Sequence, residues 1–329
     1  MPLCTSVRRF ATALALLAGL IALTPAPSGA VTVAPGPQPG CGTWVLQQVS
    51  SKAALERQAP AIDAALANSG VAGLSVRVPW SAIDTDFSVL NSAAALAKAR
   101  GKQLSVRFMA GTSTPARVFN EGAHYFTVGT KKIPKPFSNT GVPGNPVFER
   151  NFQAVVTKLA AWSRANGVKV LHLPWYGYQW AEIYNGTDLQ ATKGYSYDAW
   201  LKGHLKLLDM GLAVSGSDLT VEFALSGHWG GNATAAKTIA DRIVASTGAW
   251  SRRAMVQGNG LGQWNAPATK SSVFHAKQMV DGGDYDWASI YQTLRTNDEA
   301  YVEVYLSSFS GPRKASLFTQ AQSFKTQRC

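Results

Sequence analysis

The segment Val170–Gly186 joins a short apolar run to a cluster of Trp and Tyr residues that surrounds one carboxylate, Glu182. Aromatic faces stack on the C–H faces of sugar rings. An apolar, aromatic setting also disfavours the charged form of a carboxylic acid, which raises its pKa toward a value useful for proton donation. The segment therefore predicts a sugar-binding cleft with a general acid in it. A surface loop that carries a solvated Glu182 is the alternative.

A second carboxylate, Glu303, lies in the strand-like run Tyr301–Leu306. Strand alternation places Tyr301 and Tyr305 on the same face as Glu303, and it turns Arg77 and Arg107 toward the same interior. Arginine beside it would keep this carboxylate ionised, as a nucleophile requires.

Two carboxylates with pKa values pushed apart are typical of glycoside hydrolysis. The pair Glu182 and Glu303 is therefore the predicted catalytic pair. Two alternatives stay open: a purely structural ion pair between Glu303 and Arg77, and Glu222 as the nucleophile.

Other polar and aromatic side chains follow or line the predicted strands, where a barrel enzyme keeps its site. The predicted substrate-binding residues are Arg77, Trp80, Arg107, His172, Trp175, Tyr176, Trp180, Asn185, Glu222, His228, Trp229, Gln257, Asn259, Trp264 and Tyr305.

Motifs for other chemistries are absent from the sequence. It has no G-x-S-x-G, no HExxH and no phosphate-binding GKS/T loop, and no two of its five histidines have metal-ligand spacing. We therefore expect neither a metal nor an organic cofactor.

Strand and helix patterns alternate along the chain and predict an α/β fold. The expected strands are Trp44–Val49, Leu74–Val78, Leu104–Met109, Val170–Leu173, Leu219–Leu225, Ala254–Gln257 and Tyr301–Leu306, with Trp287–Gln292 ambiguous between strand and helix. The expected helices are Lys52–Ala67, Val89–Arg100, Val147–Asn166, Tyr197–Met210, Ala233–Thr247, Ser271–Val280 and Lys314–Lys325.

This alternation predicts a single-domain (β/α)8 TIM barrel. An open doubly wound sheet is the alternative, but no G-x-G-x-x-G follows a strand. The tetrapeptide LSVR occurs at Leu74 and again at Leu104, about one strand-plus-helix unit apart. Long loops are expected after strands three and four, from Gly111 to about Pro146 and from Trp175 to Tyr195. The first is predicted to be an ordered lid, and both fall at the carboxyl face of the barrel.

The chain resembles the retaining (β/α)8-barrel glycoside hydrolases of the cellulase and β-galactosidase type. The resemblance rests on Trp175–Gly177 with Trp180–Ile183 after the fourth strand, and on Tyr301–Tyr305 near the end. It implies that Glu182 is the acid/base, Glu303 the nucleophile and Arg77 its support. Two positions depart from that superfamily: Ala181 stands where Asn usually precedes the acid/base, and the usual nucleophile sits on strand seven.

The ends of the chain predict export. Arg8 and Arg9 precede an apolar run and a small-residue cleavage region, so residues 1–30 are expected to be a secretory signal peptide. A Pro/Gly-rich lead (31–40) and the catalytic barrel (41–329) would follow. A retained signal anchor is the alternative, and no other membrane association is expected. The two remaining cysteines, Cys41 and Cys329, are predicted to form a disulfide in an oxidising compartment.

The formal charge of +12 is carried by scattered basic residues, so nucleic acid is not an expected partner. Acidic glycans or a cell-wall polymer would suit this charge, which could equally serve solubility. The prediction is a secreted, monomeric glycoside hydrolase acting on a polysaccharide or oligosaccharide. A non-catalytic glycan-binding protein on a degenerate barrel, and a cell-wall-associated structural protein, are the alternatives.

Overall fold

The computed structural model describes residues 38–179, 183–225, 233–259, 272–278, 285–297, 299 and 301–329, and for Ala233 and Asn259 the backbone alone. All of them belong to one compact unit, Val33–Cys329. The predicted signal peptide (1–30) lies outside the described residues. No helix in the described ranges is long and apolar enough to span a bilayer.

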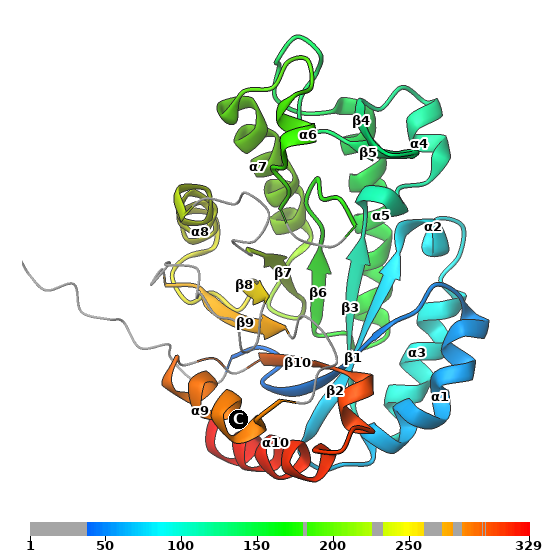
Figure 1. Ribbon diagram of the computed structural model, residues 1–329, viewed down its shortest axis with the longest axis vertical. Helices are drawn as coiled ribbons and strands as arrows, with labels where there is room; N and C mark the ends of the chain where they lie inside the picture. Colours follow the sequence, from blue (N-terminus) through cyan, green and yellow to red (C-terminus); the bar gives the residue numbers. More distant parts are fainter. Residues whose placement is uncertain are drawn as a thin grey trace, which may run out of the picture. The chain divides into compact units, whose positions relative to one another are not determined.

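Eight parallel strands close into a barrel, which confirms the predicted (β/α)8 fold (Figure 1). Around the barrel they follow the order β1-β10-β9-β8-β7-β6-β3-β2. Their bounds are Gly42–Gln48 (β1), Val71–Pro79 (β2), Gln103–Met109 (β3), Val170–Leu173 (β6), Thr220–Ala224 (β7), Ala254–Asn259 (β8), Phe274–Gln278 (β9) and Tyr301–Tyr305 (β10).

Helices pack around the barrel and cover the apolar outer faces of its strands. The longer ones are Lys52–Leu66 (α1), Ser88–Ala99 (α3), Pro146–Ala165 (α5), Tyr197–Val214 (α7), Ala233–Thr247 (α8), Trp287–Thr296 (α9) and Lys314–Arg328 (α10). The short ones are Trp80–Ile83 (α2), Ala116–Asn120 (α4) and Thr187–Gln190 (α6), with 3-10 turns at Gly111–Ser113 (η1) and Leu306–Phe309 (η3).

The predicted helix Ser271–Val280 is wrong, because its described part is the barrel strand β9. A parallel barrel strand is covered on both faces, so it shows no simple alternation of polar and apolar residues. Here Phe274 and Ala276 face the barrel interior, while Lys277 and Gln278 are polar yet buried. Pairing with β8 and β10 outweighs the weak strand propensity of this segment.

The ambiguous run Trp287–Gln292 is helical and belongs to α9. The Asp286 side chain caps this helix by accepting hydrogen bonds from the backbone N–H groups of Ala288 and Ser289. Its buried residues, Trp287, Ile290, Tyr291 and Leu294, follow helical spacing. With β9 as the seventh barrel strand, Glu303 on β10 lies on the eighth.

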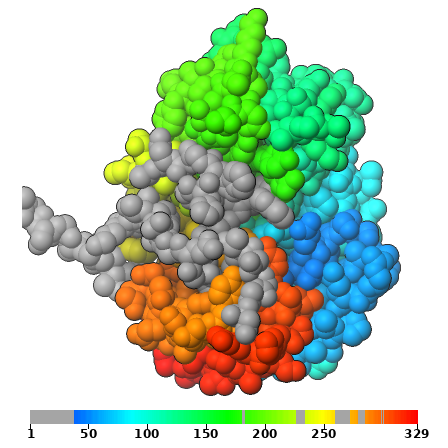
Figure 2. Space-filling model, in the orientation of Figure 1, coloured from blue at the N-terminus to red at the C-terminus, as the bar shows by residue number. Residues whose placement is uncertain are grey.

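The long loop after β3 is ordered and carries structure of its own, including a hairpin of Tyr125–Val128 (β4) and Lys131–Pro134 (β5). It contacts the loop after β6, since the Lys135 ammonium donates to the backbone oxygen of Lys193 at 3.0 Å. Strands β3 and β6 run toward these insertions (Figure 1), which project beyond the barrel as the green part of the surface in Figure 2.

The predicted disulfide is present: Cys41, just before β1, is bonded to Cys329 at the end of α10, with the Cα atoms 5.6 Å apart. It joins the start and the end of the barrel across a sequence separation of 288. The bond therefore ties the first strand to the last helix, as predicted for the two cysteines that remain after the signal peptide.

Candidate functional site

Polar side chains occupy the middle of the barrel interior, where bulky aliphatic residues are usual. The echoed tetrapeptides lie side by side, since Ser75 pairs with Ser105 and Arg77 with Arg107 in the β2–β3 register. His172, Glu222, Gln257 and Glu303 reach the same interior from β6, β7, β8 and β10 and are all buried. The inward orientation that strand alternation predicts for Arg107 and Glu303 is therefore confirmed.

Glu303 lies at the centre of this polar layer, and both of its carboxylate oxygens accept hydrogen bonds. Oε1 accepts from the hydroxyls of Ser75 at 2.5 Å and Tyr301 at 2.9 Å. Oε2 accepts from Arg107 Nη2 at 2.6 Å and from Gln257 Nε2 at 3.2 Å. These donors favour the ionised form of a carboxylate that water does not reach.

Arg107 makes an ion pair with Glu303 at 2.6 Å. The same Nη2 also donates to Gln257 Oε1 at 2.5 Å and lies 3.5 Å from Glu222 Oε1. Arg77, one strand away, donates from Nη1 to the hydroxyl of Tyr305 at 3.0 Å. The supporting role that the resemblance gave to Arg77 is thus shared with, and dominated by, Arg107.

Glu222 is linked to Glu303 through His172. Its Oε1 lies 2.6 Å from His172 Nδ1, and Nε2 of the same ring lies 3.2 Å from Glu303 Oε1. Nε2 also lies 2.6 Å from the Ser105 hydroxyl. Among the described residues, Glu222 Oε2 has no hydrogen-bond partner. One oxygen of Glu222 is thus held in place and the other is left unsatisfied.

The two carboxylates have opposite pKa shifts. Burial raises the pKa of Glu222, and the nearby His172 and Arg107 only partly offset this effect. Burial acts in the same direction on Glu303, but Arg107 and His172, with the Ser75 hydrogen bond, outweigh it and lower the pKa of Glu303 to about 2. The interior therefore keeps Glu303 ionised at neutral pH and disfavours the charged form of Glu222 relative to it.

A mostly apolar layer closes the barrel beneath these groups. It consists of Trp44, Val170, Met255, Phe274, Ala276 and Tyr301. Trp44 stacks on Tyr301 with ring centroids 5.2 Å apart, so the Tyr301 ring belongs to the apolar layer and its hydroxyl to the polar one. Any approach to the carboxylates must therefore come from the opposite, carboxyl end of the strands.

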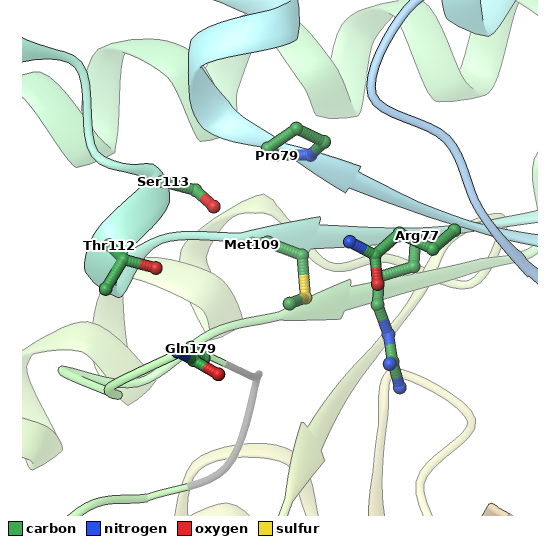
Figure 3. Close-up of a pocket in the computed structure, with 7 residues that line it drawn as sticks. Arg77, Pro79, Met109, Thr112, Ser113 and Gln179 are labelled. Carbon is green, nitrogen blue, oxygen red and sulfur yellow. The ribbon is translucent and has the colours of Figure 1, made fainter. Parts of the chain in front are cut away.

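At that carboxyl end lies a hollow of about 150 Å³, here called the mouth pocket (Figure 3). Its lining residues are Gln48, Arg77, Pro79, Met109, Thr112, Ser113 and Gln179. The oxygen atoms of Thr112, Ser113 and Gln179 turn toward Met109, and the Arg77 side chain extends past it from β2 (Figure 3). The pocket thus combines one guanidinium with neutral polar groups.

The wall of the mouth pocket is fixed by a close approach of two loops at Gly111. This residue has a φ of +60°, and the backbone N–H of Thr112 next to it donates to the Tyr178 carbonyl at 2.8 Å. A Cβ at Gly111 would lie 2.1 Å from that carbonyl oxygen. The close contact therefore requires glycine, and it brings Thr112 and Ser113 beside Gln179.

Several predicted binding residues are core residues. Trp80 is fully buried against Phe108 and Phe148, and its indole N–H donates to Asp84. Trp175 is buried against Phe223, and its indole N–H donates to the Ala224 carbonyl oxygen. Both rings face the helical layer, so the prediction that they stack on a ligand is wrong.

Tyr176 and Asn185 likewise belong to the packed layer outside the barrel. The Tyr176 hydroxyl donates to Glu149 Oε1 at 3.1 Å, and the side-chain oxygen of Asn185 accepts from the Tyr195 hydroxyl at 3.0 Å. Both residues are buried: Tyr176 connects the loop after β6 to α5, whereas Asn185 connects two parts of that loop. Neither lines the mouth pocket.

Six predicted residues cannot be placed at the site. Trp180, Glu182, His228, Trp229 and Trp264 lie outside the described residues, as does the side chain of Asn259. The pairing of Glu182 with Glu303 therefore remains a prediction.

Sequence reasoning missed Ser75, Ser105 and most of the mouth pocket. The two serines stand two residues before Arg77 and Arg107 in the echoed tetrapeptides, so strand alternation could have found them. Gln48, the last residue of β1, could have been found by the same alternation. Thr112, Ser113 and Gln179 come from loops, where no periodicity places a side chain. Among the described residues, no cluster of three His, Cys, Asp or Glu side chains could hold a metal.

No protein-family model and no curated protein matches this chain. Solved structures do match it. The catalytic domain of β-amylase from Paenibacillus polymyxa is 10% identical, with a TM-score of 0.51 over 88% of this chain and 99% of that one. The 6-hydroxypseudooxynicotine amine oxidase from Pseudomonas geniculata N1 is 11% identical, with a TM-score of 0.54 over 88% of this chain and 48% of that one.

At such low identities, the likeness to these structures establishes the fold alone. The closed parallel sheet and its flanking helices define a single-domain (β/α)8 TIM barrel. Function must be argued from the buried polar layer and the mouth pocket.

Proposed function

We propose that this protein is a glycoside hydrolase that binds its glycan at the carboxyl end of the barrel. The observation that carries the proposal is the pair Glu222 and Glu303, two buried carboxyl groups whose pKa values shift in opposite directions. Burying charge in a barrel interior is costly, and clusters of titratable groups with perturbed pKa values concentrate at functional sites. An interior built only for stability would be filled with aliphatic side chains.

In this proposal, Glu303 is the nucleophile and Glu182 is the general acid that later activates water, as in retaining enzymes. The low pKa of Glu303 supports its role as the nucleophile. Glu182 follows Gln179 by three residues, and Gln179 lines the mouth pocket. For attack on an anomeric carbon, one Glu303 oxygen must give up a hydrogen bond so that it can contact the substrate.

Activity of three glutamate variants on a panel of polysaccharides tests this proposal, with the product anomer followed by NMR. Glu182→Gln and Glu303→Gln should each lower turnover about 10²–10⁴-fold, whereas Glu56→Gln, on the exposed face of α1, should not. Circular dichroism verifies that each variant is folded. Full activity in folded Glu303→Gln would remove Glu303 from the mechanism, and an inverted anomer would exclude retention.

Glycan binding without hydrolysis is the second candidate function. The complete burial of Glu303 favours it, as does the end of the seventh strand, where Gln278 stands instead of a carboxylate. Wild-type protein that binds oligosaccharides yet releases no product across the whole panel would establish this function in place of hydrolysis.

We also propose that the protein is secreted and acts as a monomer. Its Cys41–Cys329 disulfide supports an oxidising compartment, and the basic charge suits an acidic glycan or cell-wall polymer as partner. Mass spectrometry of the exported protein should give an N-terminus near Val31. Size-exclusion chromatography should give the mass of one chain.

A further inference from the structure

His172 lies between the two buried carboxyl groups of the barrel and is itself only 1% exposed. Its Nδ1 atom lies 2.6 Å from Glu222 Oε1. Its Nε2 atom lies 2.6 Å from the Ser105 hydroxyl, 3.1 Å from the Tyr301 hydroxyl and 3.2 Å from Glu303 Oε1. Both ring nitrogens therefore have polar partners, and one nitrogen faces the proposed nucleophile.

The neighbours of Nε2 favour a proton on that nitrogen. An ionised carboxylate only accepts hydrogen bonds, so an unprotonated Nε2 would set its lone pair against the Glu303 oxygen. The hydroxyl proton of Tyr301 is already placed to serve Glu303 Oε1, which lies 2.9 Å away. The hydroxyl oxygens of Ser105 and Tyr301 are both able to accept from an N–H group. A protonated Nε2 therefore suits all three neighbours.

Glu222 fixes the ring from its other side. In the 2.6 Å contact with Nδ1, one proton lies between oxygen and nitrogen, whether the carboxyl or the ring carries it. A neutral ring that accepts from the Glu222 carboxyl has its own proton on Nε2, because the hydrogen bond of one ring nitrogen sets the protonation of the other. An imidazolium that donates to the Glu222 carboxylate also has a proton on Nε2. In both states an N–H group of His172 faces Glu303.

We propose that His172 is a positioning residue for the nucleophile: Glu222 fixes the ring through Nδ1, and the N–H group at Nε2 keeps Glu303 ionised and in place. This inference rests on the proposed role of Glu303 in glycoside hydrolysis. It gives Glu222 the task of orienting a histidine, as the carboxylate of a Ser-His-Asp triad does. Glu222 is then not a second nucleophile.

The effect of His172 must be separated from that of the other groups around Glu303. The charged and titratable side chains near Glu303 are Arg77 on β2, Arg107 on β3, His172 on β6, Glu222 on β7 and Tyr301 on β10, whereas its neighbours in register on β1 and β9, Trp44 and Gln278, are neutral, as is Gln257 of β8. Burial raises the pKa of Glu303, but the attraction of Arg107 and then of His172, with smaller effects of Ser75 and Arg77, lowers it to about 2. Removing the ring alone should therefore raise the pKa of Glu303.

An NMR titration tests the inference without a substrate, on protein whose glutamates are isotope-labelled at the side-chain carboxyl carbon. The Glu303 signal is identified by its absence in Glu303→Gln. In His172→Phe, the midpoint of this signal should move upward from its wild-type value by about 1–3 pH units, the effect of one close opposite charge. His172→Gln keeps an N–H donor but not the ring, so it should give a smaller upward shift. It also serves as the test if His172→Phe does not fold.

His204→Phe is the matched control, because it removes another fully buried imidazole, which lies on α7 outside the barrel and contacts the Trp200 carbonyl oxygen. It should leave the Glu303 midpoint unchanged. Nitrogen NMR of the His172 ring gives a second readout, with the signals identified by their absence in His172→Gln. Nε2 should carry a proton at neutral pH, and a proton on Nδ1 alone would overturn the inference.

The outcomes separate this inference from the function beneath it. An unchanged Glu303 midpoint in the folded His172 variants, or an equal shift in His204→Phe, would overturn the role of His172 and leave glycoside hydrolysis standing. On a glycan that the protein cleaves, the acid limb of kcat/KM in His172→Phe should move to higher pH together with the NMR midpoint. Failure to cleave any glycan while the NMR shift is present would instead overturn the proposed function.

Discussion

His172 and Glu222 form the contact that links the two buried carboxylates of the barrel. Nδ1 of the ring lies 2.6 Å from Glu222 Oε1, and Nε2 of the same ring lies 3.2 Å from Glu303 Oε1. One imidazole thus contacts both acids, and the Arg107 guanidinium also contacts both. Because the groups share partners, the charge of each carboxyl depends on the other.

Removing the arginine from this cluster should cost much of the stability of the protein. Arg107→Met leaves the buried Glu303 charge without its ion-pair partner, for which we expect a loss of about 3–5 kcal/mol in the free energy of unfolding. Urea unfolding followed by circular dichroism measures the loss. The double variant Arg107→Met/Glu303→Gln should recover part of it, since no uncompensated charge then remains.

Arg242→Met is the control for Arg107→Met. It breaks an ion pair with Asp209, but both side chains are about half exposed, so the loss should be much smaller than in Arg107→Met. Equal losses in the two variants would show that burial of the Arg107–Glu303 pair has no energetic consequence.

Glu299 should make stability fall as the pH rises above about 4.5. Burial raises the pKa of Glu299 to about 7, and the attraction of Lys277, at 3.3 Å, only partly offsets this shift. Because its pKa is raised in the folded state, Glu299 stabilises the folded protein fully at pH values below the pKa that it has in the unfolded chain. That stability is lost as the pH rises through the folded value. At about 1.4 kcal/mol per pKa unit, the loss between pH 4.5 and 7.5 should reach about 3 kcal/mol.

Urea unfolding at a series of pH values tests this dependence, with Glu299→Gln as the comparison. The difference in unfolding free energy between wild type and Glu299→Gln should shrink as the pH rises across this window. A pH-independent difference for Glu299→Gln would contradict the raised pKa.

The polar layer could be predicted because strand alternation is a local rule. Once Arg77 and Glu303 are placed on strands, their inward direction follows from which neighbours are apolar. The seven predicted strands are all present for the same reason. Strand β9 was missed because polar Lys277 and Gln278 are buried there by partners distant in sequence, Glu299 among them. No pattern of residues within the segment indicates those partners.

The aromatic residues were less predictable than the charged ones. Trp80 and Trp175 both follow barrel strands, and an aromatic side chain at a strand end can turn to a ligand or to the helical layer. The choice is made by packing against Phe108, Phe148 and Phe223, which come from other elements. A buried charge, by contrast, must face a partner, so its type already limits where it can lie.

The disulfide should contribute strongly to stability, because it closes nearly the whole chain. With a sequence separation of 288 between Cys41 and Cys329, its loss should cost about 5–6 kcal/mol on chain-entropy grounds. The double variant Cys41→Ser/Cys329→Ser and reduced wild type should have matching urea midpoints, both below that of the oxidised protein. Adding reductant to the double variant should change nothing. Equal midpoints with and without the bond would show that the ends of the barrel are already fixed by packing.

Gly111 should be intolerant of a side chain because of its contact and not because of its backbone angle. Gly101 has nearly the same φ, +61° against +60°, but a Cβ there would meet nothing within 4 Å. Gly101→Ala should therefore cost only the left-handed backbone penalty, about 1 kcal/mol.

In Gly111→Ala, the new Cβ would lie 2.1 Å from the Tyr178 carbonyl oxygen, so the two loops must separate. We expect an additional loss of about 2 kcal/mol in urea unfolding and weaker binding of glycans in calorimetry, since the wall of the mouth pocket moves. Equal stability and equal glycan affinity in the two variants would show that this contact does not shape the pocket.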